Sequence, residues 1–246
     1  MKNSITRIYI DAKLSVGRDV ELPKAARHHV IRVLRLSAGA PITLFNGRGG
    51  EFNGVISSHN LRSTFVNVHH FSPIERESPL SITLVQGISR GERMDYTIQK
   101  AVELGVEAIV PFQALRTSVR VPLERRQRRL EHWRGIIRHA CEQCGRNRVP
   151  ALSEIHSLDE VLSIVATKFS LLLHPAGKKE IPELSNNIRP LLLIVGPEGG
   201  LDDTETARLQ AANCFSLCVG PRILRTETAA VTALSILQAR FGDLAF

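Results

Sequence analysis

A glycine-rich loop, Gly196-Pro197-Glu198-Gly199-Gly200, is the stretch of this sequence whose residue types and spacing most clearly suggest chemistry. Its glycines can adopt positive φ and bring bare backbone against a ligand. The loop has no lysine and does not read G-x-G-x-x-G, so it lacks the features of a phosphate-binding loop. Its one charged side chain, Glu198, would repel phosphate. The loop therefore predicts a site for a neutral or cationic ligand and not for a nucleoside triphosphate.

A second loop has the same design. The strand expected at 215–219 ends at Gly220-Pro221, and the loop 222–225 leads into a helix that Thr226 is expected to cap. That helix, expected at 227–238, is apolar nearly all round. Such a helix is buried either in the core or against another subunit.

Buried strands and capped helices are expected to position these loops. Residues 191–195 are five consecutive branched aliphatics, which is typical of a strand buried on both faces of a parallel sheet. After the first loop, Asp202 and Glu205 have the spacing of a capping box at a helix start. A strand, a loop and a helix in this order place the loop at the carboxyl edge of a sheet, where open α/β proteins bind ligands.

Two domains are expected around this core. From residue 80 onward strands and helices alternate, which indicates an α/β domain over 80–246. The prolines at both ends of a polar stretch predict a linker over 73–79. Residues 1–72 contain short strand signals and one helix, expected at 23–36, which together predict a small β-barrel. Further strands are expected at 7–10, 41–45, 51–56, 65–69, 80–86, 106–112 and 169–175, and further helices at 95–105 and 123–144.

The charge balance favours a polyanionic partner such as RNA. The formal net charge is +8 and the pI is near 9.8. The helix expected at 123–144 and its flanks contain ten arginines and no lysine, which suggests forked recognition of phosphate or carboxylate. A solvated basic surface without a partner is the alternative. These arginines are Arg116, Arg120, Arg125, Arg126, Arg128, Arg129, Arg134, Arg138, Arg146 and Arg148.

The four cysteines superficially resemble a zinc or redox motif. Cys141 and Cys144 share one face of an expected helix, and Cys214 and Cys218 share one face of an expected strand. Zinc knuckles place their cysteines on a tight turn instead. We therefore expect buried free thiols and no metal.

No apolar run approaches the length of about 20 residues that a membrane span needs, and the N-terminus lacks the apolar segment of a signal peptide. A cytoplasmic protein without membrane contact is expected.

The two loops and several shorter motifs together resemble a known family. Gly196–Gly200 combined with the run Gly220–Ala229 looks like the RsmE-type 16S rRNA (uracil-N3)-methyltransferases of the SPOUT class. The resemblance spans essentially the whole chain, although Cys144 stands where the family usually has serine, and Arg90 and Arg93 where lysines are common. Further matching motifs are Arg32-Val33-Leu34-Arg35, Leu44-Phe45-Asn46-Gly47, Gln99-Lys100-Ala101-Val102-Glu103-Leu104-Gly105-Val106 and Glu142-Gln143-Cys144-Gly145-Arg146.

The resemblance implies fold, cofactor and partners. The N-terminal barrel would be a PUA-like RNA-binding domain, and the C-terminal α/β domain would contain a parallel sheet with a deep trefoil knot. The protein would be a homodimer that uses S-adenosyl-L-methionine to form 3-methyluridine in 16S rRNA of the small ribosomal subunit. A methyl donor with a sulfonium and no phosphate also agrees with a glycine loop that lacks lysine.

The resemblance also assigns residues. From the chemistry of uracil N3 we hypothesise that Arg225 holds the negative charge that develops on the uracil carbonyls, and that Glu227 or Glu198 acts as base or orients the donor. The alternative for Glu227 is a first-turn residue that the helix dipole favours. RNA-binding is implied for Arg7, Arg32, Arg35, Arg90, Arg93 and Arg146. The donor-binding residues would be Leu173, His174, Gly196, Pro197, Glu198, Gly199, Gly200, Leu217, Gly220, Ile223, Leu224, Thr226 and Ala229.

Two other functions remain open from the sequence. Related knotted enzymes that methylate the ribose 2′-hydroxyl share the Gly-Pro-Glu-Gly loop. A non-catalytic RNA-binding or ribosome-assembly protein would show no affinity for the donor. The base that the enzyme modifies would have to be unpaired or flipped out of its stack.

Overall fold

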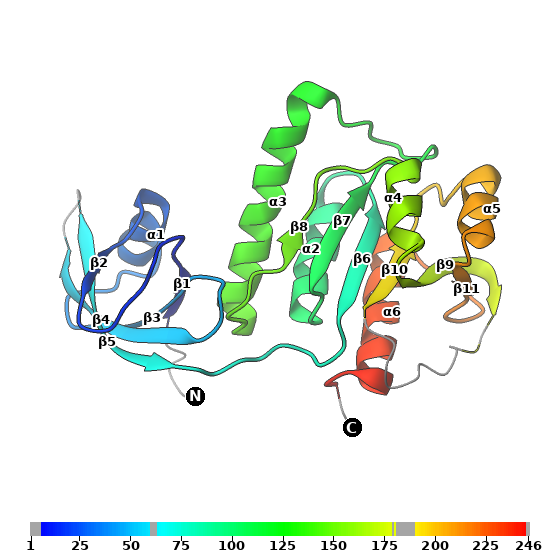
Figure 1. The fold of residues 1–246 in the computed structure, drawn as a ribbon. Coiled ribbons are helices and arrows are strands. Elements are labelled where there is room, and N and C mark those ends of the chain that lie inside the picture. The colour runs from blue at the N-terminus through cyan, green and yellow to red at the C-terminus, as the bar shows by residue number, and fades with distance from the viewer. Residues whose placement is uncertain (1–5, 60–62, 179, 181–189, 245–246) are drawn as a thin grey trace. The chain divides into compact units, whose positions relative to one another are not determined.

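The computed structural model describes residues 6–59, 63–178, 180 and 190–244, which form two compact units (Figure 1). The first unit comprises Met1–Glu77 and Arg138–Val149, and the second comprises Ser78–Ile137 and Pro150–Phe246. The boundary at Glu77 falls inside the stretch 73–79 that the sequence predicts as a linker. The segment 138–149 was not expected in the first unit. It belongs there because Glu142 accepts a hydrogen bond from the Tyr9 N–H at 2.9 Å, and Asn147 accepts one from Arg7 at 2.6 Å.

The first unit is a five-stranded sheet with one short helical segment. Its strands are β1 (Thr6–Tyr9), β2 (Asp19–Glu21), β3 (Pro41–Phe45), β4 (Glu51–His59) and β5 (Thr64–Ser72), in the order β1-β3-β4-β5-β2. β1 pairs in parallel with β3, and the other pairs are antiparallel. Alternating side chains such as Ile8, Ile42, Leu44 and Val66 point into a common core.

The helix of this unit is shorter than the sequence predicts. α1 (Lys24–His28) continues into a π-helical turn, η1 (His29–Val33), and helical structure ends before Arg35, which has φ of +53°. A positive φ is incompatible with a right-handed helix, so the predicted end at residue 36 is wrong. The four strands expected here are confirmed, and β2 was not expected.

The second unit is built on a six-stranded sheet in which every pair is parallel. β10 has all five residues at most 2% exposed, as its unbroken aliphatic run predicts, and it lies between β9 and β6. The order is β11-β9-β10-β6-β7-β8, with β6 (Ile82–Gly87), β7 (Ala108–Phe112), β8 (Ala151–Leu152), β9 (Phe169–Lys178), β10 (Leu191–Val195) and β11 (Phe215–Leu217).

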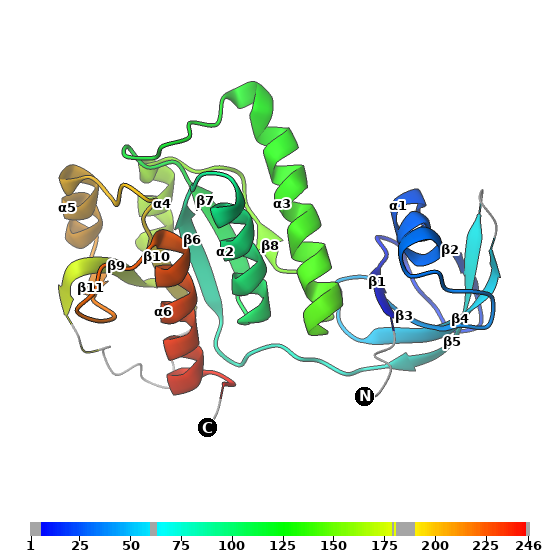
Figure 2. The same cartoon turned by 180° about the vertical axis from the view of Figure 1, so that it is seen from behind.

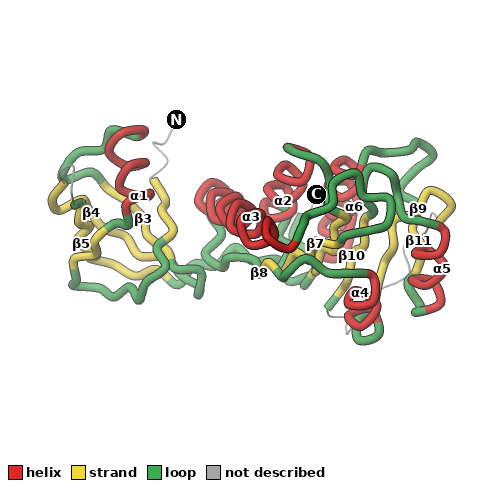
Figure 3. The backbone as a smooth tube through the Cα atoms, turned by 90° about the horizontal axis from the view of Figure 1, so that it is seen from above, coloured by secondary structure: helices red, strands yellow, loops and turns green. Residues whose placement is uncertain are grey.

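Helices cover both faces of this sheet. α2 (Glu92–Glu103) and α6 (Thr226–Phe241) lie side by side on one face (Figure 2). α3 (Leu123–Cys144) lies next to α2, and its residue His132 contacts Asp95 in the first turn of α2. α4 (Leu158–Val165) lies on the opposite side of the strands, as the view from above shows (Figure 3). α5 (Asp203–Ala211) begins with the predicted capping box, in which Asp202 accepts from the Thr204 N–H and Glu205 accepts from the Asp202 N–H.

This architecture confirms the α/β prediction with a parallel sheet. The trefoil knot that the resemblance implies stays a prediction. Within the described ranges, no helix combines the length and the apolarity that a membrane crossing requires.

Candidate functional site

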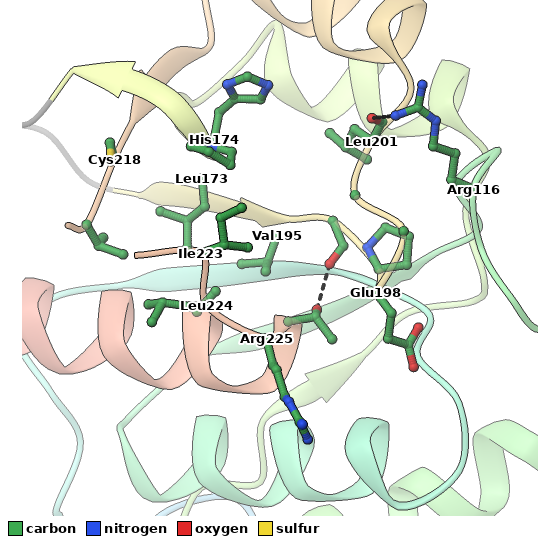
Figure 4. A pocket seen from close by; sticks show the side chains of 18 of the residues that line it. Arg116, Leu173, His174, Val195, Glu198, Leu201, Cys218, Ile223, Leu224 and Arg225 are labelled. Carbon is green, nitrogen blue, oxygen red and sulfur yellow. Dashed lines mark hydrogen bonds between the residues drawn. The ribbon is translucent and has the colours of Figure 1, made fainter. Parts of the chain in front are cut away.

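A pocket of about 620 Å³ opens in the second unit at the carboxyl ends of β9, β10 and β11 (Figure 4). Its walls come from the strand ends, the glycine loop 196–200, the loop 218–225 and the first turn of α6. Parallel strands end at one edge of the sheet, so loops that are far apart in sequence meet there.

Every residue that the resemblance assigned to donor binding lines this one pocket. The pocket wall also contains residues that were not predicted. Pro175, Val195, Leu201, Cys218, Val219 and Arg222 are sequence neighbours of predicted residues, and that adjacency could have identified them. Asp203 follows the loop, but Arg116 comes from the separate loop after β7, and no signal in the sequence pointed to it. The predicted residues found together are Leu173, His174, Gly196, Pro197, Glu198, Gly199, Gly200, Leu217, Gly220, Ile223, Leu224, Thr226 and Ala229.

Thr226 connects the glycine loop to the start of α6. Its hydroxyl donates to the Gly196 carbonyl oxygen at 2.6 Å and accepts from Gln86 Nε2 at 2.9 Å. Gln86 and Thr226 are buried, so water does not compete for these hydrogen bonds. The sequence predicts Thr226 as the N-cap of α6, but in the structure the N-cap is Arg225. Thr226 is the first helical residue, and its hydroxyl fixes the neighbouring loop instead.

The loop after β7 holds the other side of the glycine loop. Arg116 donates to the Leu201 carbonyl oxygen at 3.3 Å, and its guanidinium lies 3.4 Å from an Asp202 carboxylate oxygen. A Cβ on Gly199 would lie 2.8 Å from the Arg116 carbonyl oxygen, so only glycine fits this approach. The loop after β7 therefore has a structural role at the pocket.

Glu198 is held in its ionised form. Its Oε1 accepts from the Arg90 N–H at 2.8 Å and from the Arg93 guanidinium at 3.3 Å. Burial raises the pKa of this carboxyl, but the hydrogen bonds and the charge of Arg93 outweigh burial and leave the pKa below its ordinary value. A carboxylate with a lowered pKa is a poor proton acceptor. The geometry therefore favours a positioning role for Glu198 over the role of general base.

Glu227 lies on the other side of Arg93. Its Oε1 is 3.9 Å from Arg93 Nε, so one guanidinium is close to two carboxylates. Among the described residues, Glu198 Oε2 and Glu227 Oε2 are both buried without a hydrogen-bond partner. Such an unpaired carboxylate oxygen is costly to bury and can accept a proton or a donor from a ligand.

Arg225 differs from Arg93 in having no ion-pair or hydrogen-bond partner among the described residues. It is exposed, and within the part of the chain that the structure describes its guanidinium makes no ion pair or hydrogen bond. Figure 4 shows Arg225 pointing from the start of α6 toward α2, on the same side of the pocket as Glu198. Its guanidinium is therefore available to an anion or a carbonyl group of a ligand.

The six residues predicted to bind RNA are in different environments. Arg32, Arg35, Arg90 and Arg93 are exposed, and Arg93 lies close to the two carboxylates. For Arg7 and Arg146 the assignment stays a prediction, and the structure gives both side chains a different role, because they are largely buried in ion pairs inside the first unit. Arg7 pairs with Glu51, and Arg146 donates to Glu77 at 3.1 Å and is 4% exposed.

The four cysteines are free. Cys141 and Cys214 are buried, and burial raises the pKa of their thiols to about 12 and about 11. The prediction of burial is wrong for Cys144 and Cys218, which are partly exposed. β11 ends at Leu217, so Cys218 falls in the loop and lines the pocket. The described residues contain no group of three or more His, Cys, Asp or Glu suited to a metal ion.

Comparisons with known proteins agree with this fold and site. The model of an RNA methyltransferase domain matches residues 76–238, and that of an RNA methyltransferase PUA domain matches residues 22–64. The ribosomal RNA small subunit methyltransferase E of Buchnera aphidicola subsp. Schizaphis graminum is 33% identical, with 99% of this chain and 100% of that protein covered. The protein of the same name from Bacillus subtilis is 32% identical, with 86% of each chain covered.

Two solved structures are similar along almost the whole chain. A methyltransferase of Legionella pneumophila, solved with bound SAM, is 41% identical with a TM-score of 0.94. The ribosomal RNA small subunit methyltransferase E of Neisseria gonorrhoeae, solved with S-adenosyl methionine, is 36% identical with a TM-score of 0.91. Each comparison covers 98% of this chain and 100% of the other. The chain belongs to the RNA methyltransferase family, within the group of the ribosomal RNA small subunit methyltransferases E.

Proposed function

We propose that this protein transfers the methyl group of S-adenosyl-L-methionine to N3 of a uridine in the 16S rRNA of the small ribosomal subunit. The observation that carries the proposal is that all thirteen predicted donor-binding residues line one pocket. The names of the relatives support the small-subunit rRNA as substrate, and the two similar structures with bound donor support the cofactor.

The pocket fits this donor chemically. Leu173, Ile223 and Leu224 offer an apolar wall for the adenine ring, and the glycine loop offers backbone groups. None of the described residues that line the pocket is a lysine, and Glu198 places a negative charge near a ligand that carries a sulfonium. When bound, the donor supplies an electrophilic methyl group whose sulfur leaves as a neutral thioether.

Arg225 is proposed to stabilise the uracil. N3 of uracil carries a proton at neutral pH, and its loss places negative charge on the two flanking carbonyl oxygens. The unpaired guanidinium of Arg225 can donate to one of these oxygens as the charge develops. Such a preorganised donor acts mainly on the transition state and little on the ground state.

Glu227 is proposed to accept the N3 proton. Glu198 is the weaker candidate because its lowered pKa disfavours protonation. Glu227 keeps one buried oxygen that has no hydrogen-bond partner among the described residues, and it lies close to Arg93, which also contacts Glu198. We assign Glu198 to the positioning of the glycine loop and Arg93 to the alignment of both carboxylates.

Exchanging each glutamate for glutamine separates these roles. Glu227→Gln should lower kcat by about 10²-fold, near the lower limit for general base catalysis, with the affinity for the donor unchanged. Glu198→Gln should weaken donor binding several-fold and leave most of kcat at saturating donor. Calorimetry with S-adenosylmethionine and steady-state kinetics measure both effects. The reverse pattern would assign the base to Glu198.

Glu198 should also make stability depend on pH. Its pKa is lowered in the folded state, so its stabilising effect is complete above the ordinary carboxyl value of 4.5 and is lost as the pH falls through the folded-state pKa. Thermal unfolding should therefore show a difference between wild type and Glu198→Gln at neutral pH that shrinks in acid. A difference that is constant with pH would contradict the role of the ionised carboxylate.

The remaining features of the proposal are a PUA-like RNA-binding unit, a cytoplasmic location with the ribosome and a homodimer. The PUA domain match supports the first. Exposed Ile236 on α6, 36% accessible, supports an apolar contact with a second copy on that helix.

Mass spectrometry of 16S rRNA from cells that lack this protein tests the function. We expect one 3-methyluridine to disappear and to return with the wild-type gene. Loss of a ribose 2′-O-methyl group instead would assign the other reaction. Absence of donor binding in calorimetry would identify a non-catalytic RNA-binding protein.

A further inference from the structure

Three arginines in the loop before α3 and in its first turns have no structural partner among the described residues. Arg120, Arg125 and Arg128 are exposed, and among the described residues their guanidinium groups make no ion pair or hydrogen bond. The surrounding segment 115–134 contains seven arginines against two glutamates and has no lysine. Arg125 and Arg128, three residues apart on one helix and without a partner among the described residues, repel each other and cost stability unless an anion compensates them.

Neighbouring arginines of the same helix do have structural partners. Arg134 donates to Glu131 at 2.8 Å, and Arg126 reaches the carbonyl oxygens of Val121 and Ile155 at 3.5 Å. The Arg129 guanidinium lies 5.9 Å from the centre of the Trp133 ring. Among the described residues of α3, the arginines without a partner are therefore a subset on one side of the helix and not a general property of its surface.

This side of α3 adjoins the helix that carries Arg93. Arg125, Arg128 and His132 follow one another at spacings of three and four residues, so they form one stripe. His132 Nε2 lies 2.8 Å from an Asp95 carboxylate oxygen in the first turn of α2. The stripe thus meets α2 next to Arg93, which lines the pocket.

The arginines project beyond the start of α2. His132 lies nine residues after the start of α3, whereas its partner Asp95 lies only three residues after the start of α2. At a rise of about 1.5 Å per residue, α3 extends roughly 9 Å further toward the carboxyl edge of the sheet. Figure 2 shows this overhang of α3 above α2. Arg125 and Arg128 therefore lie toward the same carboxyl edge of the sheet at which the pocket opens.

We propose that Arg120, Arg125 and Arg128 form an RNA-docking surface that contacts phosphates of the rRNA beside the methyl-transfer pocket. The inference rests on the proposed function and extends it to a surface outside the pocket. Guanidinium groups bind phosphate oxygens through paired N–H donors. This favours RNA as the partner over a protein surface whose carboxylates carry a weaker charge. Phosphate contacts on this side would hold the RNA strand while the target base occupies the methyl-transfer pocket.

The test compares two double variants with the same change in charge. Arg125→Gln/Arg128→Gln removes two surface arginines, and Arg208→Gln/Arg240→Gln removes two exposed arginines on α5 and at the end of α6. The probe is the purified small ribosomal subunit from cells that lack the protein. Binding is measured from 50 to 200 mM salt, together with donor affinity and kcat at saturating subunit.

The docking surface predicts about tenfold weaker subunit binding for Arg125→Gln/Arg128→Gln. Its slope of log K against log salt should be smaller by about 2, because each lost phosphate contact removes close to one unit. Donor affinity and kcat should match wild type, and the control variant should bind normally. Equal binding and slopes for the two double variants would overturn the inference.

Two further measurements distinguish RNA docking from membrane binding and from a failure of the proposed function. Leu115 and Leu123 are exposed nearby, so vesicles of anionic phospholipid are included. Loss of vesicle binding with unchanged subunit binding would assign the surface to a membrane and overturn the inference. If wild type transfers no methyl group, the proposed function fails, but the salt slopes still decide whether these arginines contact RNA.

Discussion

Arg225→Ala should lower kcat for methyl transfer by about 10²–10³-fold and leave the affinity for S-adenosylmethionine within about twofold of wild type. Arg225 is exposed, and among the described residues its guanidinium has no partner, so its removal breaks no contact of the fold. The lost interaction would be with the uracil oxygens, and it strengthens only as N3 loses its proton. Stopped-time methylation of small subunits and calorimetry with the donor measure the two quantities.

Two comparison variants make this expectation specific. Arg225→Lys keeps the charge but loses the planar fork, so it should recover only part of the activity. Arg240→Ala removes an exposed arginine at the far end of the same helix and should match wild type. Turnover of Arg225→Ala close to wild type would exclude Arg225 from the reaction. A parallel loss of donor affinity would indicate a role in the pocket wall instead.

The strand and loop at the centre of the site could be predicted because local patterns determine them. The aliphatic run 191–195 has only one stable environment, and a capping box requires only Asp202 and Glu205 at the right spacing. These signals placed the glycine loop at a carboxyl edge without any knowledge of the rest of the chain. The list of pocket residues came from the family resemblance, which carries information on long-range contacts that periodicity lacks.

The parts that the sequence did not predict depend on contacts between distant residues. Arg116 reaches the glycine loop from the end of β7, and nothing in its neighbours distinguishes it from the other arginines. Arg7 and Arg146 were assigned to RNA by motif and charge, but their partners Glu51 and Glu77 are far away in sequence. Whether an arginine is paired or free is a property of the tertiary structure, and here it separates Arg225 and Arg128 from Arg146.

Gly87 sets how closely the glycine loop can approach β6. A Cβ at this position would lie 2.4 Å from the Pro197 backbone nitrogen and 2.7 Å from the Gly196 carbonyl carbon. Both are backbone atoms, which cannot move aside as a side-chain end can. The Thr226 hydroxyl also fixes Gly196 from the other side at 2.6 Å, so the loop cannot retreat without breaking that hydrogen bond.

Gly87→Ala should therefore displace the loop, weaken donor binding by at least tenfold and lower the free energy of unfolding by about 1–3 kcal/mol. Gly135→Ala is the matched control, because an added Cβ there meets no atom within 4 Å and α3 should become more stable by roughly 0.5–1 kcal/mol. Thermal unfolding and calorimetry with S-adenosylmethionine compare the two variants. Normal donor affinity in Gly87→Ala would show that the loop tolerates displacement from β6, and the close packing of Gly87 on Pro197 would then have no part in donor binding.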